Sequence, residues 1–166
     1  MLKKLVLMVA ILLLIPFTAE AAERPEMEKY VQETAEHYGL SSSLVEAVIF
    51  TESSWRERAD NGICKGLMQI QPSTGKWIAG ELGIKNLNLF NYKHNIQIGC
   101  WYLNYLRDYW YNKGYTDEDT LYLMLISYNR GPGGCAKWVK NHNMEDNAYA
   151  NKVLQEKYKI DMEEFV

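Results

Sequence analysis

The amino-acid sequence predicts a mainly α-helical fold with one small hairpin or extended loop beside a cleft. Apolar residues recur at i, i+3, i+4 and i+7 along much of the chain, which is the spacing of one helix face. Glycine or proline follows several of these periodic runs and would end them. Residues 56–72 break the helical spacing, with a turn at Asp60-Asn61-Gly62. The non-helical segment is therefore expected there.

The predicted helices are bounded by residues that start or stop helices. Pro25 favours a first turn, and Ser73 and Thr74 offer N-caps. Glycine is the common residue after a helix end, so Gly39 and the Gly-Pro-Gly turn at residues 131–133 are expected to end helices. Apart from the helix that carries Glu52, we expect helices over residues 25–38, 73–82, 94–110, 117–130, 135–140 and 147–158.

The second helix begins among the serines at residues 41–43 and carries the residue of greatest chemical interest. Ser43 and Glu46 have the spacing of a capping box. Glu52 lies seven positions after Val45, on the same apolar face of the helix. The Glu52 carboxyl is therefore predicted to point toward the core and not toward water.

Burial is expected to raise the pKa of Glu52. Loss of water disfavours the charged form of a carboxyl, and the negative end of the helix dipole adds to this effect if the helix ends near Ser53. A carboxyl that keeps its proton near neutral pH suits a general acid. The alternative is a buried Glu52 that forms an ion pair with an arginine or a lysine.

Residues 1–21 have the pattern of a signal peptide. Two lysines precede an apolar run over residues 5–17, and small residues then occupy both positions that a signal peptidase reads. The apolar run is shorter than the roughly 20 residues of a membrane span, so an uncleaved anchor is less favoured. Residues 22–166 are expected to form a single domain, exported to the periplasm or to the extracellular cell wall, without a stable membrane span.

Charge and cysteine content exclude some partners and leave others open. The net charge is −3 and the basic residues are scattered, so neither nucleic acid nor an anionic membrane is an expected ligand. Cys64, Cys100 and Cys135 would allow one disulfide and one free thiol in an oxidising compartment, with any of the three pairings. None of the three histidines has ligand spacing to another histidine or to a cysteine, so no metal is expected.

Two further segments lie where side chains converge on a cleft. Residues 66–70 read G-L-M-Q-I within the predicted loop, and residues 127–133 read S-Y-N-R-G-P-G at a helix end. Taken in order with Glu52 and Ser53, these segments resemble the Slt-type lytic transglycosylase domain, a lysozyme-like fold that cleaves bacterial peptidoglycan. The resemblance covers residues 38–154.

The resemblance implies one catalytic residue and a set of sugar-binding residues. Glu52 matches the single catalytic acid of the family. Gln69 and Asn129 both donate and accept hydrogen bonds, which suits sugar hydroxyl and acetamido groups. Met68 and Tyr128 suit an apolar floor or, alternatively, plain core packing. The implied substrate-binding residues are Ser53, Met68, Gln69, Gln71, Tyr128, Asn129 and Tyr149.

The implied activity is non-hydrolytic cleavage of the β-1,4 bond between N-acetylmuramic acid and N-acetylglucosamine. Glu52 would protonate the bridging oxygen and, as a carboxylate, would then activate the muramoyl 6-hydroxyl. The product is a 1,6-anhydro sugar, and no cofactor is needed. The expected partners are peptidoglycan glycan strands and, by analogy alone, a secretion or conjugation machine of the cell envelope.

Two other functions stay open. A lysozyme-like hydrolase would use water as the acceptor, and ordinary glycoside hydrolysis needs a second carboxyl, for which Asp60 and Glu57 are the nearest candidates. A non-catalytic peptidoglycan-binding component of a secretion or conjugation apparatus would not need the Glu52 carboxyl at all. Analysis of the cleavage products tests the first alternative, and a Glu52→Gln variant tests the second.

Overall fold

The computed structural model describes residues 19–163, and within this range it contains helices and no β-strand. The mainly α-helical prediction is confirmed. The signal-peptide prediction falls mostly on residues 1–18, outside the described residues, and stays a prediction. The elements are α1 (Ala19–His37), α2 (Ser42–Ser53), α3 (Pro72–Glu81), α4 (Tyr92–Tyr111), α5 (Asp117–Arg130), α6 (Pro132–Trp138), the 3-10 helix η1 (Met144–Asp146) and α7 (Ala148–Glu163).

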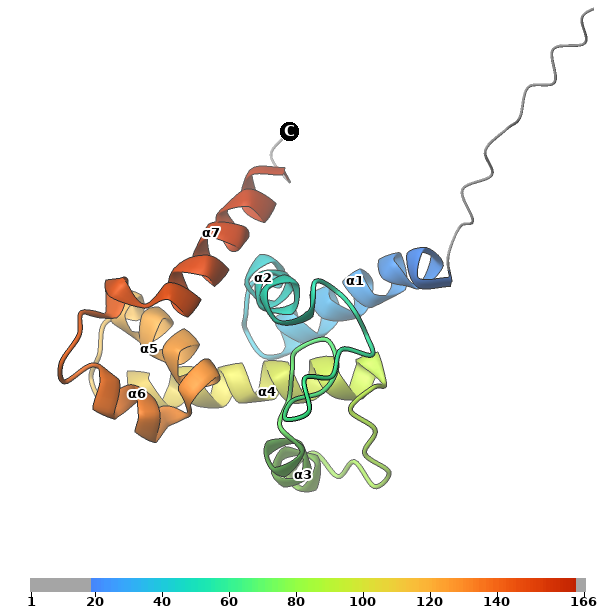
Figure 1. Cartoon of the computed structure of the whole chain (residues 1–166), viewed down its shortest axis with the longest axis horizontal. Coiled ribbons are helices and arrows are strands. Elements are labelled where there is room, and N and C mark those ends of the chain that lie inside the picture. Colours follow the sequence, from blue (N-terminus) through green and yellow to red (C-terminus); the bar gives the residue numbers. More distant parts are fainter. Residues whose placement is uncertain (1–18, 164–166) are drawn as a thin grey trace, which may run out of the picture.

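Helix α4 crosses the middle of the molecule, and most other elements pack on it or on its neighbours (Figure 1). α1, α3 and α5 contact α4, whereas α2 packs between α1 and α7. The core is one cluster of buried apolar side chains to which α2, α4 and α5 all contribute, with Val48, Leu103 and Leu125 fully buried. This packing places the C-terminal end of α2 beside α7 and beside the long loop that leads to α3 (Figure 1).

Helix α1 begins earlier than predicted, at Ala19, so that Pro25 lies inside the helix and not in its first turn. The residues before Pro25 are mainly alanine and glutamate, which are strong helix formers. They extend the helix through the proline although the proline cannot donate a backbone hydrogen bond. Helix α7 also extends beyond the predicted end at Tyr158, to Glu163.

The N-cap of α2 is Ser41, whose side chain accepts a 3.3 Å hydrogen bond from the backbone N–H of Leu44. The predicted capping box of Ser43 and Glu46 is therefore wrong. Ser43 lies inside the helix and is buried. Three consecutive serines make the cap ambiguous in the sequence, and the packing of α2 decides the position.

Proline determines where α3 and α6 begin. Helix α3 starts at Pro72, so the predicted caps Ser73 and Thr74 lie within its first turn. Helix α6 starts at Pro132, before the predicted start at Cys135. Proline suits the first helical position because its φ is already near the helical value and its missing N–H would have had no partner there.

All three cysteines are free thiols, so the disulfide that the sequence would allow is not formed. Cys64 lies in the loop before α3, Cys100 in the buried face of α4, and Cys135 in α6. The Cys135 thiol donates to the backbone carbonyl of Leu123, at 3.7 Å. Burial raises the pKa of the Cys100 and Cys135 thiols. Cys100 and Cys135 are enclosed in the core, whereas Cys64 is half-buried in the loop.

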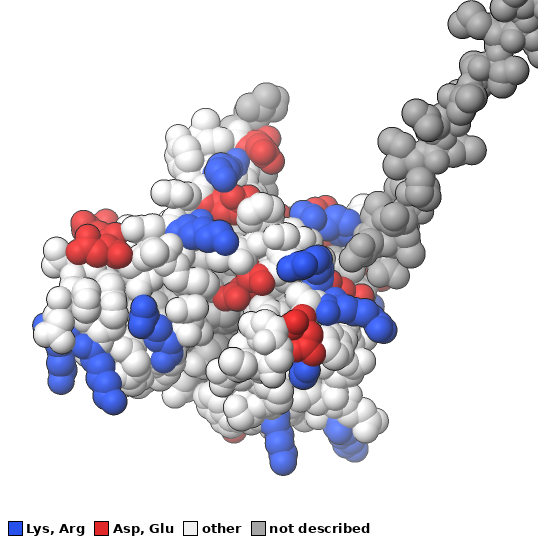
Figure 2. Space-filling model, viewed as in Figure 1, with Lys and Arg blue, Asp and Glu red and all other residues white. Residues whose placement is uncertain are grey.

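Charged side chains are spread over the molecule. On the face shown in Figure 2, lysines and arginines lie singly or in small groups, with acidic side chains and uncharged areas between them. This face therefore has no continuous basic surface of the kind that binds a phosphate backbone. Among residues 19–163, no helix combines the length and the apolar character that crossing a membrane requires.

Candidate active site

Glu52 lies in the last turn of α2, where that helix packs against α7. Its Oε1 atom accepts a 2.6 Å hydrogen bond from the hydroxyl of Tyr149, which is 97 positions away in the sequence. Burial raises the pKa of Tyr149 well above its usual value, so this hydroxyl keeps its proton and acts as the donor. The α2–α7 contact thus supplies Glu52 with a neutral hydrogen-bond donor.

Burial also raises the pKa of Glu52 itself. The hydrogen bond from Tyr149 and the positive charge of Lys152 oppose this rise without reversing it. Within residues 19–163, no arginine or lysine forms an ion pair with Glu52. Among the described residues Glu52 is therefore not part of a buried ion pair, and burial favours the neutral form of its carboxyl.

The chain turns sharply immediately after Glu52. Ser54 and Trp55 both have left-handed backbones, with φ of 51° and 65°. Such a conformation costs about 1–2 kcal/mol for each non-glycine residue. The Trp55 ring is buried, and the guanidinium of Arg24 lies 3.7 Å from its centroid, so packing holds the turn in place. The turn leads the chain into the loop that forms one wall of the site.

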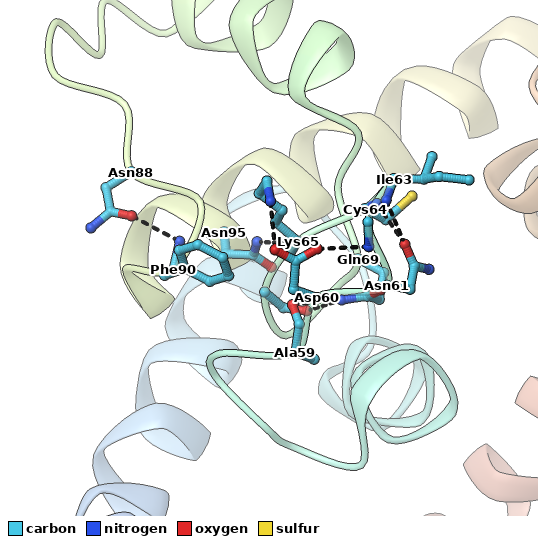
Figure 3. Close-up of polar contacts among 12 residues, drawn as sticks. Ala59, Asp60, Asn61, Ile63, Cys64, Lys65, Gln69, Asn88, Phe90 and Asn95 are labelled. Carbon is cyan, nitrogen blue, oxygen red and sulfur yellow. Dashed lines mark hydrogen bonds and ion pairs between the residues drawn. The ribbon is translucent and has the colours of Figure 1, made fainter.

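One buried side chain, Asn95 of α4, organises this loop (Figure 3). Its Nδ2 donates to the carbonyls of Lys65 and Leu89, at 2.9 and 2.8 Å. Its Oδ1 accepts a 2.7 Å hydrogen bond from the backbone N–H of Met68. Gly66 lies against this amide with φ of +79°, and a Cβ there would overlap Asn95 and the Leu89 carbonyl. The G-L-M-Q segment is thus fixed to α4 through its backbone.

The same loop folds back on itself as a small hairpin-like turn. Lys65 and Ile70 exchange two backbone hydrogen bonds, each 3.0 Å long, and Lys65 also pairs with Asp60 in an isolated bridge. Gln69 has φ of 47°, and its Nε2 donates to the carbonyls of Ala59 and Gly66. These bonds orient the Gln69 amide and do not engage its Oε1. The predicted hairpin or extended loop beside the cleft is confirmed.

Met68 lies beneath the site. Its side chain is fully buried and packs on Gly99 of α4, where any Cβ would overlap the Met68 sulfur. Its backbone carbonyl accepts a 2.9 Å hydrogen bond from the hydroxyl of Tyr128. Burial raises the pKa of Tyr128 well above its usual value, so this hydroxyl remains a donor. The hydrogen bond between Tyr128 and the Met68 carbonyl thereby joins the loop to α5.

A cleft of about 370 Å³ lies next to the buried Met68 side chain. Glu52 is the only carboxyl among the described residues that line it. Neither candidate second carboxyl reaches the cleft. Glu57 accepts a hydrogen bond from the backbone N–H of Tyr92, at 3.1 Å. Asp60 pairs with Lys65 at 2.6 Å, and this contact lowers the Asp60 pKa. The lining residues are Glu52, Asn61, Cys64, Gln69, Ile70, Gln71, Thr74, Tyr102, Tyr128, Asn129, Arg130 and Gly131.

Comparison with known protein families identifies the family to which this chain belongs. Residues 29–151 match the family described as the Transglycosylase SLT domain. The chain belongs to this family. The match includes Glu52, the Asn95-bound loop and the first residues of α7. The transglycosylase activity in the name of the family is consistent with a cleft that one carboxyl lines among the described residues.

Curated relatives of this SLT domain are longer proteins. The domain is 31% identical over 121 residues to the membrane-bound lytic murein transglycosylase C of Salmonella arizonae, covering 69% of this chain and 34% of that protein. It is 31% identical over 138 residues to the membrane-bound lytic murein transglycosylase E of Buchnera aphidicola, covering 79% of this chain and 63% of that protein. The chain therefore spans less than two thirds of the length of these relatives.

Solved structures confirm the fold of the SLT domain. An inactive mutant of the lytic transglycosylase Slt from Pseudomonas aeruginosa superposes with a TM-score of 0.64 at 24% identity, covering 86% of this chain and 24% of that one. The 70-kDa soluble lytic transglycosylase of Escherichia coli gives 0.66 at 22% identity, covering 81% and 24%. The predicted lysozyme-like helical fold is thus confirmed.

The predicted site residues of the SLT domain fall into two groups. Glu52, Gln69, Gln71, Tyr128 and Asn129 line the cleft. The other three do not line the cleft but lie next to residues that do. Met68 is buried beneath it, and Tyr149 donates to Glu52. Ser53 is buried, and its hydroxyl donates to the Ile49 carbonyl, at 3.1 Å.

Several lining residues of the SLT domain were not predicted from its sequence. Asn61 lies in the Asp-Asn-Gly turn and Arg130 within the S-Y-N-R-G-P-G segment, so both had a local signal. Tyr102 had none, because it continues an ordinary helical stripe of α4. Among residues 19–163, no cluster of three or more histidine, cysteine or acidic side chains is arranged to hold a metal ion.

Proposed function

We propose that this SLT domain is an exported peptidoglycan lytic transglycosylase, which cleaves the β-1,4 bond between N-acetylmuramic acid and N-acetylglucosamine without water. The observation that carries the proposal is a cleft lined by one carboxyl, Glu52, whose pKa burial raises. The names of the curated relatives, lytic murein transglycosylases, support the same reaction and substrate class.

The first step needs Glu52 as a general acid. Tyr149 donates to Oε1, so the proton of the neutral carboxyl resides on Oε2. Oε2 transfers this proton to the bridging oxygen as the bond to the muramoyl anomeric carbon breaks. The leaving N-acetylglucosamine departs with a free hydroxyl, and the substrate's own N-acetyl group stabilises the muramoyl cation. Because burial raises the Glu52 pKa, a larger fraction of the carboxyl is in the acid form at a given pH than for a free glutamate.

The second step uses the same residue as a base. The Glu52 carboxylate, still hydrogen-bonded by Tyr149, takes the proton from the muramoyl 6-hydroxyl. The 6-oxygen then attacks the anomeric carbon, which closes the 1,6-anhydro ring and returns Glu52 to its protonated form. No second carboxyl is needed, in contrast to ordinary glycoside hydrolysis. The engagement of Glu57 and Asp60 elsewhere supports this single-residue cycle.

Digestion of purified sacculi with mass spectrometry of the products tests the proposal. We expect fragments that end in 1,6-anhydromuramic acid and no reducing muramic acid ends. Fragments with reducing ends alone would assign the domain to the hydrolases instead.

The Glu52→Gln variant is the matched control for this digestion, because it keeps the shape of the side chain and an oxygen that accepts the Tyr149 hydrogen bond. We expect it to bind sacculi and to release no fragments. A Glu52→Gln variant with full biological activity would instead indicate a non-catalytic peptidoglycan-binding component.

A further inference from the structure

A partly exposed group of aromatic rings lies beside the cleft, on α3 and α4. It consists of Trp77, Trp101 and Tyr105, here called the aromatic platform. The Trp77 ring meets Trp101 and Tyr105 edge-on, with both centroid distances 5.3 Å. Trp101 and Tyr105 stack at 5.5 Å with an interplanar angle of 6°. The three rings fix one another in place.

The platform continues directly from the cleft wall. Tyr102 lines the cleft, and its ring lies 5.7 Å from that of Tyr128 on one side. On the other side the Tyr102 ring lies 6.3 Å from Tyr105 and 6.4 Å from Trp77. Thr74, another lining residue, precedes Trp77 by one turn of α3. An unbroken series of rings therefore leads from the cleft to the surface.

Core packing alone does not explain the platform. Trp77 and Tyr105 are 43% and 37% exposed, so a large part of each ring faces solvent. Isolated exposed aromatic side chains are common, but a contiguous exposed group beside a cleft is typical of a binding surface. Tryptophan and tyrosine rings give large, stiff and uncharged contact areas, which match the apolar faces of neutral sugar rings.

We propose that the aromatic platform binds sugar rings of the glycan strand by stacking, outside the two sugars whose bond is cleaved. The inference rests on the proposed function, because it takes the strand in the cleft to be the occupant. Continuity from Tyr128 through Tyr102 to Trp77 and Tyr105 gives the strand a path out of the cleft. The platform would then make affinity depend on the length of the strand.

Calorimetric titration in the Glu52→Gln background tests the platform, because binding is then measured without cleavage. The probes are chitotriose and chitohexaose. We expect chitohexaose to bind more tightly than chitotriose, and Trp77→Ala combined with Tyr105→Ala to weaken chitohexaose binding roughly tenfold while changing chitotriose binding little. Tyr111→Ala is the matched control, since Tyr111 is a 59% exposed tyrosine of the same helix that lines a different hollow with Leu44.

Equal chitohexaose affinity with and without the platform rings would overturn the inference. If the double substitution prevents folding, the intact Glu52→Gln protein answers the question through tryptophan fluorescence. Chitohexaose must then change the emission, and Trp77→Phe must remove most of that change; an emission that chitohexaose leaves unaltered rejects the platform.

The two proposals fail separately. Platform-dependent chitohexaose binding together with reducing muramic acid ends in the sacculus digest would retain the platform and reject the transglycosylase reaction. Anhydro products together with chitohexaose binding that does not depend on the platform would retain the transglycosylase reaction and reject the platform.

Discussion

The hydroxyl of Tyr149 donates a 2.6 Å hydrogen bond to Oε1 of Glu52 and so joins α7 to the end of α2. This bond stabilises the carboxylate form and opposes the effect of burial on the Glu52 pKa. Tyr149 is thereby a positioning residue that also limits how far the pKa of the acid rises. The pKa of Glu52 thus reflects loss of water, which raises it, against the Tyr149 hydrogen bond and the positive charge of Lys152, which lower it.

Replacing Tyr149 with phenylalanine should slow cleavage and shift its pH dependence. Removal of the hydrogen bond raises the Glu52 pKa further, so the loss of kcat/KM at alkaline pH should move to higher pH. The carboxylate would also be less stabilised during the reaction, and we expect a rate loss of roughly ten- to a hundredfold. Rates measured across pH check this. Tyr158→Phe, at an exposed position of α7, is the control, and an unchanged profile in Tyr149→Phe would contradict the prediction.

Glu52→Gln should stabilise the fold at neutral and alkaline pH. The folded-state pKa of Glu52 is raised, so ionising it costs stability. The cost is absent below the ordinary pKa of 4.5, grows as the pH rises through the window up to the folded-state pKa, and is constant above it. The variant lacks this cost and should be more stable than the native protein at pH 8, with no difference near pH 4.

Urea denaturation of both proteins across this pH range measures the difference. Glu36→Gln, at an exposed position of α1, provides the control and should show no such trend. A Glu52→Gln variant less stable than the native protein at pH 8 would show that the carboxylate is not penalised in the fold.

Gly66→Ala should destabilise the domain far more than Gly62→Ala. Both glycines have positive φ, +79° and +85°, so both substitutions carry a backbone penalty of about 1–2 kcal/mol. At Gly66 the new methyl group would also overlap Asn95 and the Leu89 carbonyl, whereas the space at Gly62 is open. We expect a total loss of more than about 3 kcal/mol for Gly66→Ala. Urea denaturation midpoints of the two variants check the ranking. Equal losses of stability would mean that the contact of Gly66 with Asn95 is not as close as the structure shows.

Cys64 should report occupancy of the cleft. It lines the cleft, whereas Cys100 and Cys135 are buried, so a thiol reagent should modify Cys64 first in the folded protein. The modified protein should lose cleavage because the added group fills the cleft. Chitohexaose bound to the Glu52→Gln variant should slow the modification several-fold. Mass spectrometry follows the modification, with Cys64→Ser as the unreactive control. A modification rate that chitohexaose does not change would show that the oligosaccharide binds outside the cleft.

The sequence by itself determined the elements that depend on local order. Helical spacing and terminal glycines predicted the helices, and the position of Glu52 on an apolar face predicted its raised pKa. The break in spacing over residues 56–72 predicted the loop beside the cleft. Local patterns failed where neighbouring residues competed for one role, as among the serines before α2.

Tertiary structure decided which distant side chains meet. The partner of Glu52 lies 97 positions away, and whether Glu57 and Asp60 enter the cleft depends on contacts with Tyr92 and Lys65. The continuity of Tyr102 with the aromatic platform likewise requires α3 to lie against α4. Spacing along one helix fixes only the face on which a side chain lies. The packing of helices against one another fixes what that face touches, and for Glu52 it determines both the burial that raises the pKa and the Tyr149 hydrogen bond that lowers it.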